Sequence, residues 1–324
     1  MFTSDSLVQS LQKTSVYFDL ADFPLTKEEL FCFLWQPPDI TYDQFLILLP
    51  ACIEKKVLVE KNGYYMLPGR ESLVELRQQK LLIAEKKLAI ARRAAKIIRS
   101  VPFLKAVCVC NTVASEQANE DSDIDFFIIA AKNRIWLVRL FITLLLGFFR
   151  LRRVGNKIKD KICLSFYITE DNLDLSNLRA VEDDIHFAYW LNQMLPIFDP
   201  ENLYATFLAA NSWTKKYLPN SKNVALSSYI FAVLPTRFGS LWKKFWEKTW
   251  HGAYGDMLNA EAKKIQLSKM KFSGHDIERK ENKNVVISDA VLKFHEKDTR
   301  LEYRDRWLQK CKALQNDFYE PEKN

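Results

Sequence analysis

The segment Val107–Ala130, VCVCNTVASEQANEDSDIDFFIIA, constrains the fold of this chain more than any other. It contains two apolar runs typical of buried strands, joined by a turn and a short helical stretch. Side chains two residues apart in a strand project from the same face, so Asp123 and Asp125 point together. Carboxylates held this close repel each other unless a positive charge lies between them. The segment therefore predicts either a cation held by the strand or an exposed acidic edge.

The residues around the acid pair indicate a particular chemistry. Paired carboxylates are typical ligands of Mg²⁺ (or Mn²⁺). The preceding strand ends at Asn111-Thr112, where Asn tolerates a left-handed backbone and the turn exposes N–H groups and a hydroxyl to an anion. An ordinary helix cap is the alternative role for Thr112. A phosphate-binding turn beside a metal-binding strand is the arrangement that phosphoryl or nucleotidyl transfer requires.

Residues 1–70 predict a winged-helix-like domain. Three helical candidates come first, one of them opened by Thr26 and Glu29 in capping-box spacing. A hairpin around Asn62-Gly63 follows, the strongest short-range hairpin signal. Such domains often bind DNA, but others contact proteins, and the third helix carries Asp43 and is not basic. Nucleic acid is therefore possible as a partner but not favoured.

The rest of the chain divides into three parts. Residues 71–100 lack Pro and Gly and predict a connecting helix with one apolar stripe that includes Leu81 and Leu88. Residues 101–176 alternate strands and helices and predict a mixed sheet with covering helices. Residues 177–324 are expected to be a C-terminal helical region, so the fold class is α+β.

Composition sets further limits on this chain of 324 residues with a formal net charge of +7. The six cysteines lack CxxC spacing and indicate reduced thiols rather than disulfides or a zinc site, as in a cytoplasmic protein. The apolar run Trp136–Phe149 is interrupted by Arg139 and is shorter than the roughly 20 residues of a spanning helix. We therefore expect this run to cover the sheet and the chain to have no membrane span.

The motif Asn111-Thr112, Val113–Ser122 and Asp123-Ile124-Asp125 resembles the nucleotidyltransferase superfamily, which has the DNA polymerase beta-like nucleotidyltransferase fold. The preceding winged-helix-like domain is similar to that of an uncharacterised bacterial subgroup of these proteins. The resemblance implies that Asp123 and Asp125 hold Mg²⁺ (or Mn²⁺) against a nucleoside triphosphate. It also implies nucleotide contacts, for which the candidates are Asn111, Thr112 and Ser122. Lys293 and Arg300, seven residues apart on one face of a charged C-terminal helix, are further candidates to bind phosphates. The alternative is a charged surface helix whose acids and bases pair with one another.

Two departures from the family pattern stand out. The family's Gly-Ser turn is Asn-Thr here, and the usual third carboxylate is not evident. In the strand KICLSFYIT the positions expected to face the site are Cys163, Ser165 and Tyr167, none of them acidic. Asp171 shares the parity of Ser165 beyond the strand end, and it is the predicted third catalytic acid beside Asp123 and Asp125.

Three functions follow as hypotheses. The first is a metal-dependent nucleotidyltransferase that moves a nucleoside monophosphate to a hydroxyl-bearing acceptor of unknown identity. The second is a non-catalytic protein of the same fold that binds a nucleotide or a protein partner. The third is a winged-helix DNA-binding regulator. A carboxylate within metal reach of Asp123 and Asp125 favours the first, and its absence favours the second.

Overall fold

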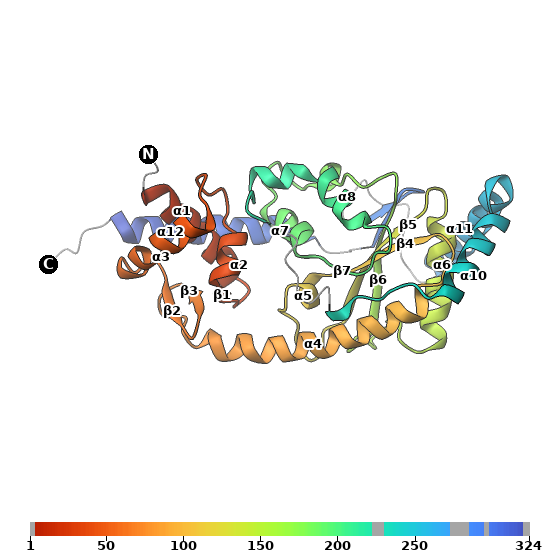
Figure 1. The fold of residues 1–324 in the computed structure, drawn as a ribbon, viewed down its shortest axis with the longest axis horizontal. Coiled ribbons are helices and arrows are strands. Elements are labelled where there is room, and N and C mark those ends of the chain that lie inside the picture. The colour runs from red at the N-terminus through yellow and green to blue at the C-terminus, as the bar shows by residue number, and fades with distance from the viewer. Residues whose placement is uncertain (1–3, 222–229, 273–284, 295–297, 320–324) are drawn as a thin grey trace.

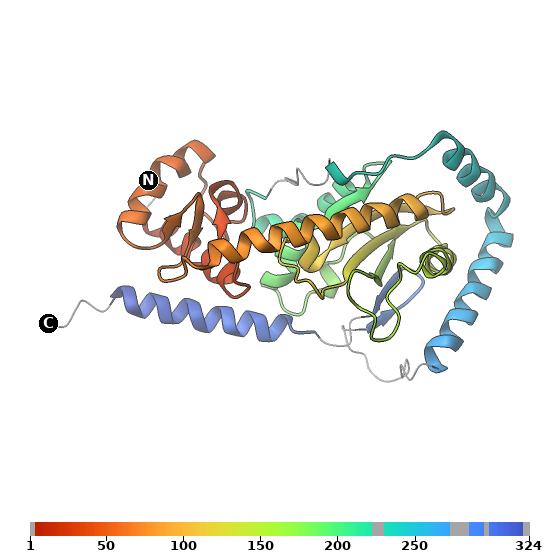
Figure 2. The same ribbon diagram turned by 90° about the horizontal axis from the view of Figure 1, so that it is seen from below.

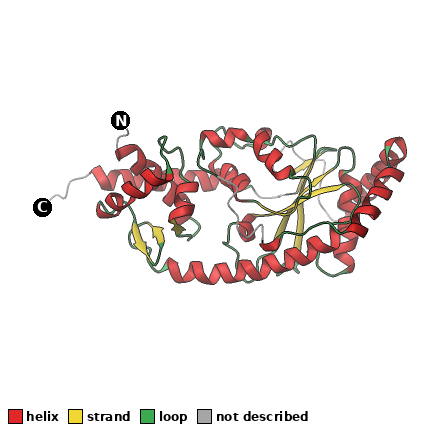
Figure 3. Ribbon diagram, viewed as in Figure 1, coloured by secondary structure: helices red, strands yellow, loops and turns green. Residues whose placement is uncertain are grey.

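The computed structural model describes residues 4–221, 230–272, 285–294 and 298–319. These residues form a mixed α+β fold with two separate sheets, a small one near the N-terminus and a larger one in the other half of the molecule (Figures 1 and 3).

The N-terminal region combines three helices with a three-stranded antiparallel sheet of order β1-β3-β2. Capping boxes open α2 at Thr26 and α3 at Thr41. Asn62 and Gly63 both have positive φ, 54° and 80°, which the two-residue hairpin turn requires, so the hairpin prediction is confirmed. The elements are α1 (Ser4–Asp19), β1 (Leu25–Thr26), α2 (Lys27–Cys32), α3 (Tyr42–Glu54), β2 (Val59–Lys61) and β3 (Tyr64–Met66).

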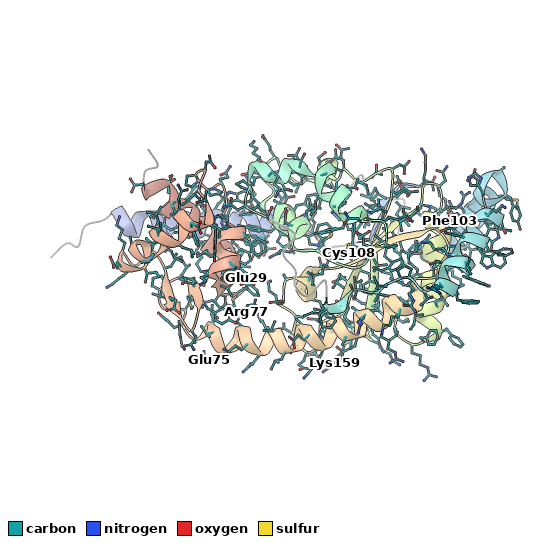
Figure 4. The ribbon with its side chains drawn as sticks, in the orientation of Figure 1. Glu29, Glu75, Arg77, Phe103, Cys108 and Lys159 are labelled. Carbon is teal, nitrogen blue, oxygen red and sulfur yellow. The ribbon has the colours of Figure 1, made fainter. Side chains whose placement is uncertain are left out.

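Helix α4 (Leu73–Ile98) joins the two halves of the molecule, as the sequence predicts. Its apolar stripe is buried at Ala84, Leu88 and Ala91. Two cations of this helix, Arg77 and Lys87, are also buried. Arg77 pairs with Glu29 of the N-terminal region and with Glu116 of the other half, at 3.0 and 2.6 Å (Figure 4). The other cation, Lys87, lies beneath the acid-rich loop that precedes β5.

The larger sheet has six strands in the order β7-β4-β5-β6-β9-β8. Strands β5 and β6 are parallel and the other neighbours antiparallel, so α6 (Ile135–Phe148) is the crossover between β5 and β6. One face of the sheet packs on α4 and α6, and the other on α7 and α8. The strands are β4 (Leu104–Cys110), β5 (Ile124–Ala130), β6 (Ile162–Thr169), β7 (Leu195–Phe198), β8 (Val285–Ile287) and β9 (Val291–Phe294).

The expectation of an all-helical region from residue 177 onward is wrong, because β7, β8 and β9 all belong to it. Each of these strands has only three or four residues. Runs that short cannot be distinguished from helix ends by periodicity. The helices of this region are α7 (Ile185–Gln193), α8 (Leu203–Ala210), α10 (Arg237–Thr249), α11 (Gly252–Phe272) and α12 (Arg300–Tyr319), with short 3-10 helices at Ser176–Leu178 and Ser212–Lys216.

Helix α12 returns to the N-terminal region and runs beside α1 (Figure 2). The Trp307 ring nitrogen donates to the Lys13 carbonyl at 2.9 Å, and the Tyr303 hydroxyl donates to the Tyr17 carbonyl at 2.8 Å. Residues nearly 300 positions apart in the sequence therefore share one apolar core.

Helix α6 covers the sheet as predicted. Its buried side chains include Trp136, Val138 and Ile142, and α11 packs on the helix from outside. Leu144 and Gly147 are exposed. Among the described residues, none of the helices has both the length and the apolar character needed to span a bilayer.

Candidate metal centre

The acid pair, Asp123 and Asp125, lies at the start of β5, which has β4 on one side and β6 on the other. Asp125 stands opposite Cys110 of β4 on one side and opposite Cys163 of β6 on the other. Asp123 precedes the first residue of β5. Ligand atoms of Asp123, Asp125 and Cys163 all lie within 4.8 Å of one another, and the three side chains are half-buried. Two carboxylates and a thiol at this spacing can hold a metal ion.

A bulge in β6 brings Cys163 into this group. Asp125 pairs with Cys163, but Phe127 pairs with Phe166, so β6 has one extra residue between the two pairs. Beyond the bulge the alternation is inverted, and Tyr167 points into the core beneath α4 and α6. The expectation that Tyr167 faces the site is therefore wrong. A hydrogen bond links Ser165, next to the bulge, to the Cys163 thiol.

The acid pair is electrostatically strained. Burial, and then the nearby charge of Asp123, raise the pKa of Asp125 from 3.8 to about 6. Burial and the charge of Asp125 raise the pKa of the Cys163 thiol to about 12. Both shifts disfavour the anionic forms that coordinate a metal. A cation bound among the three groups reverses this effect, because it stabilises their negative charge.

Arg153 supplies the nearest positive charge. Its Nη1 atom lies 2.6 Å from Oδ2 of Asp123, and it also hydrogen-bonds Cys163. The side chain is 41% exposed and comes from the loop between α6 and β6. A metal ion bound by Asp123 therefore competes with the guanidinium group for the same carboxylate oxygens. Arg153 was not identified as a site residue from the sequence, whereas Cys163 was expected to face the site.

The loop before the acid pair is held in place by hydrogen bonds from a side chain of α4. The buried Lys87 ammonium donates to the carbonyls of Glu120 and Ser122 at 3.0 and 2.8 Å and to Asp160 at 2.7 Å. The Ser122 hydroxyl accepts from the Asn119 N–H at 2.9 Å. Ser122, a predicted nucleotide contact, thus shapes the turn that leads into the pair. The exposed acids Glu120 and Asp121 lie near Lys159 instead, at 3.4 and 3.7 Å (Figure 4).

The turn after β4 has the predicted left-handed geometry, because Asn111 has a φ of 57°. Its side-chain oxygen accepts from the Trp190 ring nitrogen at 2.6 Å, and its side chain hydrogen-bonds Asp125. The adjacent Thr112 is exposed. It is not the helix cap that the sequence leaves as an alternative, since the cap position of α5 (Asn111–Ala114) is Cys110.

Asp171, the predicted third acid, is not brought to the pair. It lies beyond the opposite end of β6 and forms an ion pair with Lys132 at 3.1 Å. The intervening strand has eight residues and rises about 3.3 Å for each of them. Parity along a strand puts side chains on one face, but it does not bring the two ends of the strand together.

The prediction that Lys293 and Arg300 lie on one helix is wrong. Lys293 lies in β9, and Arg300 begins α12. Arg300 is held by Asp184 at 2.9 Å and by Asp298. Its guanidinium lies 5.2 Å from the centre of the Phe187 ring, which stacks on Trp190. The two rings lie between Arg300 and Asn111, whose side-chain oxygen accepts from the Trp190 ring nitrogen. Burial and the charge of Arg300 lower the pKa of Lys293 to about 8.

Comparisons with protein-family models, with curated proteins and with solved structures found no match to this chain.

Proposed function

We propose that this chain is a metal-dependent nucleotidyltransferase that transfers a nucleoside monophosphate from a nucleoside triphosphate to a hydroxyl-bearing acceptor. The observation that carries the proposal is the placement of Asp123 and Asp125 at the start of β5, beside the left-handed turn at Asn111. This is the spatial order of the family motif that the sequence resembles. The six-stranded mixed sheet and its covering helices support it.

In this proposal Asp123 and Asp125 would hold Mg²⁺ or Mn²⁺ through their carboxylate oxygens, and the thiol of Cys163, a soft ligand that these hard cations do not favour, would lie beside the ion. A metal ion held there would neutralise the charge that builds on the α-phosphate and on the departing pyrophosphate. The exposed Thr112 and the turn around it would contact the outer phosphates. Arg153, whose side chain is 41% exposed, would turn from Asp123 to the triphosphate. Hydrogen bonds to Trp190 and Asp125 position the Asn111 side chain at the edge of the site.

Calorimetric titration with Mn²⁺, with and without each nucleoside triphosphate, tests the site. We expect Asp123→Asn/Asp125→Asn to abolish metal-dependent nucleotide binding. The matched control is Glu120→Gln/Asp121→Asn, which removes two charges from the same loop, where both acids are largely exposed at 62% and 93%. Equal binding by the two double mutants contradicts the assignment.

A non-catalytic nucleotide-binding protein of the same fold is the second candidate, and Cys163 favours it. Among the described residues, the group around the acid pair contains no third carboxylate. The pKa of the Cys163 thiol is about 12, so the thiol keeps its own proton at neutral pH and is a poor acceptor for the proton of an incoming hydroxyl.

Label transfer separates these two candidates. The wild-type chain and Cys163→Asp are each incubated with labelled nucleoside triphosphates, Mg²⁺ and a lysate of the source organism. Transfer of label by the wild type supports the enzyme. Nucleotide binding by both proteins, with transfer by Cys163→Asp alone, supports the non-catalytic protein.

The N-terminal region suits contact with a protein better than contact with DNA. Its helices and the β1-β3-β2 sheet support a winged-helix-like domain with Asn62-Gly63 at the tip of the wing. The exposed surface of α3 carries Asp43, Glu54 and Ile47, which is 76% exposed. Acids on this helix repel phosphates, so the DNA-binding regulator is not favoured. A mobility-shift assay with random duplex DNA at low salt checks this, and tight binding contradicts it.

A further inference from the structure

Large apolar side chains lie exposed along the segment that leads into α10 and along the helix itself. Four of them lie on its outer surface, and two precede it. The exposed fractions are 66% for Ile230, 77% for Leu234, 78% for Phe238, 69% for Leu241, 47% for Trp242 and 60% for Phe245. On a helix, Phe238, Leu241, Trp242 and Phe245 are three or four residues apart and form one continuous strip. A contiguous apolar surface of this kind marks an interaction site.

The opposite side of α10 is fastened to the rest of the molecule, so the strip cannot turn inward. The Lys243 ammonium donates to the Leu104 carbonyl, and the Glu247 carboxylate accepts from the Phe103 N–H at 2.7 Å. Gly239 is buried against Ser100, where an added Cβ atom would lie 2.4 Å from the hydroxyl oxygen. Trp250, just after the helix, stacks on Phe141 of α6 with ring centres 5.6 Å apart.

The charges beside the strip have one sign. Arg237, Lys244 and Lys248 are exposed and follow one edge of it. Within residues 230–249 the single acid is Glu247, which is turned inward to Phe103. The outer surface of α10 therefore combines Trp, Phe and Leu with Lys and Arg, the composition of helices that lie in the plane of a membrane interface.

We propose that α10 docks this protein onto an anionic lipid bilayer through Phe238, Leu241, Trp242 and Phe245, with Arg237, Lys244 and Lys248 over the headgroups. A second copy of the chain fits less well. A two-fold contact across the strip gathers six cations around one apolar surface, and segment 230–249 offers no outward acid to pair with them. An anionic bilayer offers an apolar interior to the exposed apolar side chains and negatively charged headgroups to the three cations.

The docked orientation places the candidate metal centre away from the lipid. Helix α10 contacts the Phe103–Leu104 end of β4, whereas Asp125 pairs with Cys110 at the other end. The intervening length of strand is roughly 20 Å. The docking surface and the metal centre are separate sites, and the docking proposal does not depend on the proposed function.

Vesicle flotation of the full chain tests the proposal. We expect it to float with vesicles of phosphatidylcholine and phosphatidylglycerol and not with phosphatidylcholine alone. Trp242→Ser/Phe245→Ser should weaken binding about tenfold or more. The matched control Ile47→Ser/Leu82→Ser removes two apolar side chains that are also largely exposed, 76% and 59%, but lie elsewhere. Lys244→Gln/Lys248→Gln should weaken binding to anionic vesicles, whereas Lys55→Gln/Lys56→Gln should not.

Light scattering of the same proteins tests whether a second copy of the chain, rather than a lipid bilayer, covers the strip. Absence of flotation by the wild type overturns the proposal, as does equal binding by the α10 and control variants. A wild-type dimer that Trp242→Ser/Phe245→Ser converts to a monomer, with no vesicle binding, assigns the strip to a second copy instead. Circular dichroism confirms that each variant is folded, which is expected because every substituted side chain is exposed.

Discussion

Two pairs of aspartates differ in the positive charge around them, and one member of each pair has a pKa shifted in the opposite direction. Asp184 and Asp298 surround Arg300, at the start of α12. Asp123 and Asp125 share the start of β5, with the half-exposed Arg153 at their outer edge. Burial acts on both Asp298 and Asp125, but hydrogen bonds from Arg300 lower the pKa of Asp298 to about 2, while the pKa of Asp125 rises to about 6. The first pair is a structural ion cluster around a buried cation, whereas the second has the half-exposed Arg153 bound to Asp123.

The opposite pKa shifts of Asp298 and Asp125 distinguish an acid that stabilises the fold from an acid that can bind a ligand, although both residues are aspartates. A buried ion cluster with all its partners holds elements together, here α7 and α12. A carboxylate pair that repels itself in the folded state costs stability, and such sites concentrate where ligands bind. The contrast favours Asp123 and Asp125, over the acids around Arg300, as the place where a cation enters.

The largest expected effect is at the structural cluster. Asp184 is buried, bonds Arg300 at 2.9 Å and caps α7 by accepting from the Phe187 N–H at 3.0 Å. Asp184→Ala should lower the free energy of unfolding by about 3–5 kcal/mol, because it leaves a buried guanidinium with a lost partner. Urea denaturation measures this. The neighbour Asp183, 44% exposed and paired with Arg304, provides the control, and Asp183→Ala should cost less than about 1 kcal/mol.

The acid pair should respond in the opposite direction. The folded state raises the pKa of Asp125 from 3.8 to about 6, so it binds a proton more tightly than the unfolded chain does. Stability from this group is therefore full below pH 4 and lost as the pH rises through 6. In a chelating buffer at pH 7, Asp125→Asn should raise the free energy of unfolding by about 1–2 kcal/mol. At pH 4 the gain should disappear. Destabilisation at pH 7 shows that the charged form of Asp125 is already compensated.

The sequence predicts the fold best where a local signal decides the structure. Asn62-Gly63 sets a two-residue hairpin, and the long run without Pro or Gly sets α4. The strand that follows Asp123 is likewise predicted, from its apolar run. Each of these depends on residues within a few positions of one another.

The rest depends on contacts that no local pattern contains. The bulge in β6 selects Cys163 as the third member of the site and turns Tyr167 to the opposite face. Arg153 reaches Asp123 from a loop thirty residues away. Lys87 is buried on α4, because the carbonyls of a distant loop accept hydrogen bonds from its ammonium group. Short strands at the sheet edges have no periodicity long enough to identify.

A smaller effect is expected at Arg153. If this side chain is only a competing counter-ion, Arg153→Gln should tighten Mn²⁺ binding a few-fold, about the strength of a partly exposed ion pair. Lys157→Gln removes the same charge from an exposed position of the same loop and controls for net charge. Calorimetry with Mn²⁺ alone compares the two variants. In the presence of a nucleoside triphosphate, Arg153→Gln should instead bind more weakly, since the guanidinium is expected to contact the phosphates.

The smallest effect is expected at Asp171, and it tests the geometry of the site against strand parity. Asp171 is 42% exposed and pairs with Lys132, which is 67% exposed, at the far end of β6. Asp171→Asn should leave Mn²⁺ affinity unchanged and alter the free energy of unfolding by less than about 1 kcal/mol, because exposed ion pairs contribute little. Asp125→Asn, opposite the bulge, should weaken Mn²⁺ binding in the same titration. If Asp171→Asn is the variant that loses the metal, the third ligand comes from the strand end, and β6 does not carry the bulge that places Cys163 beside Asp125.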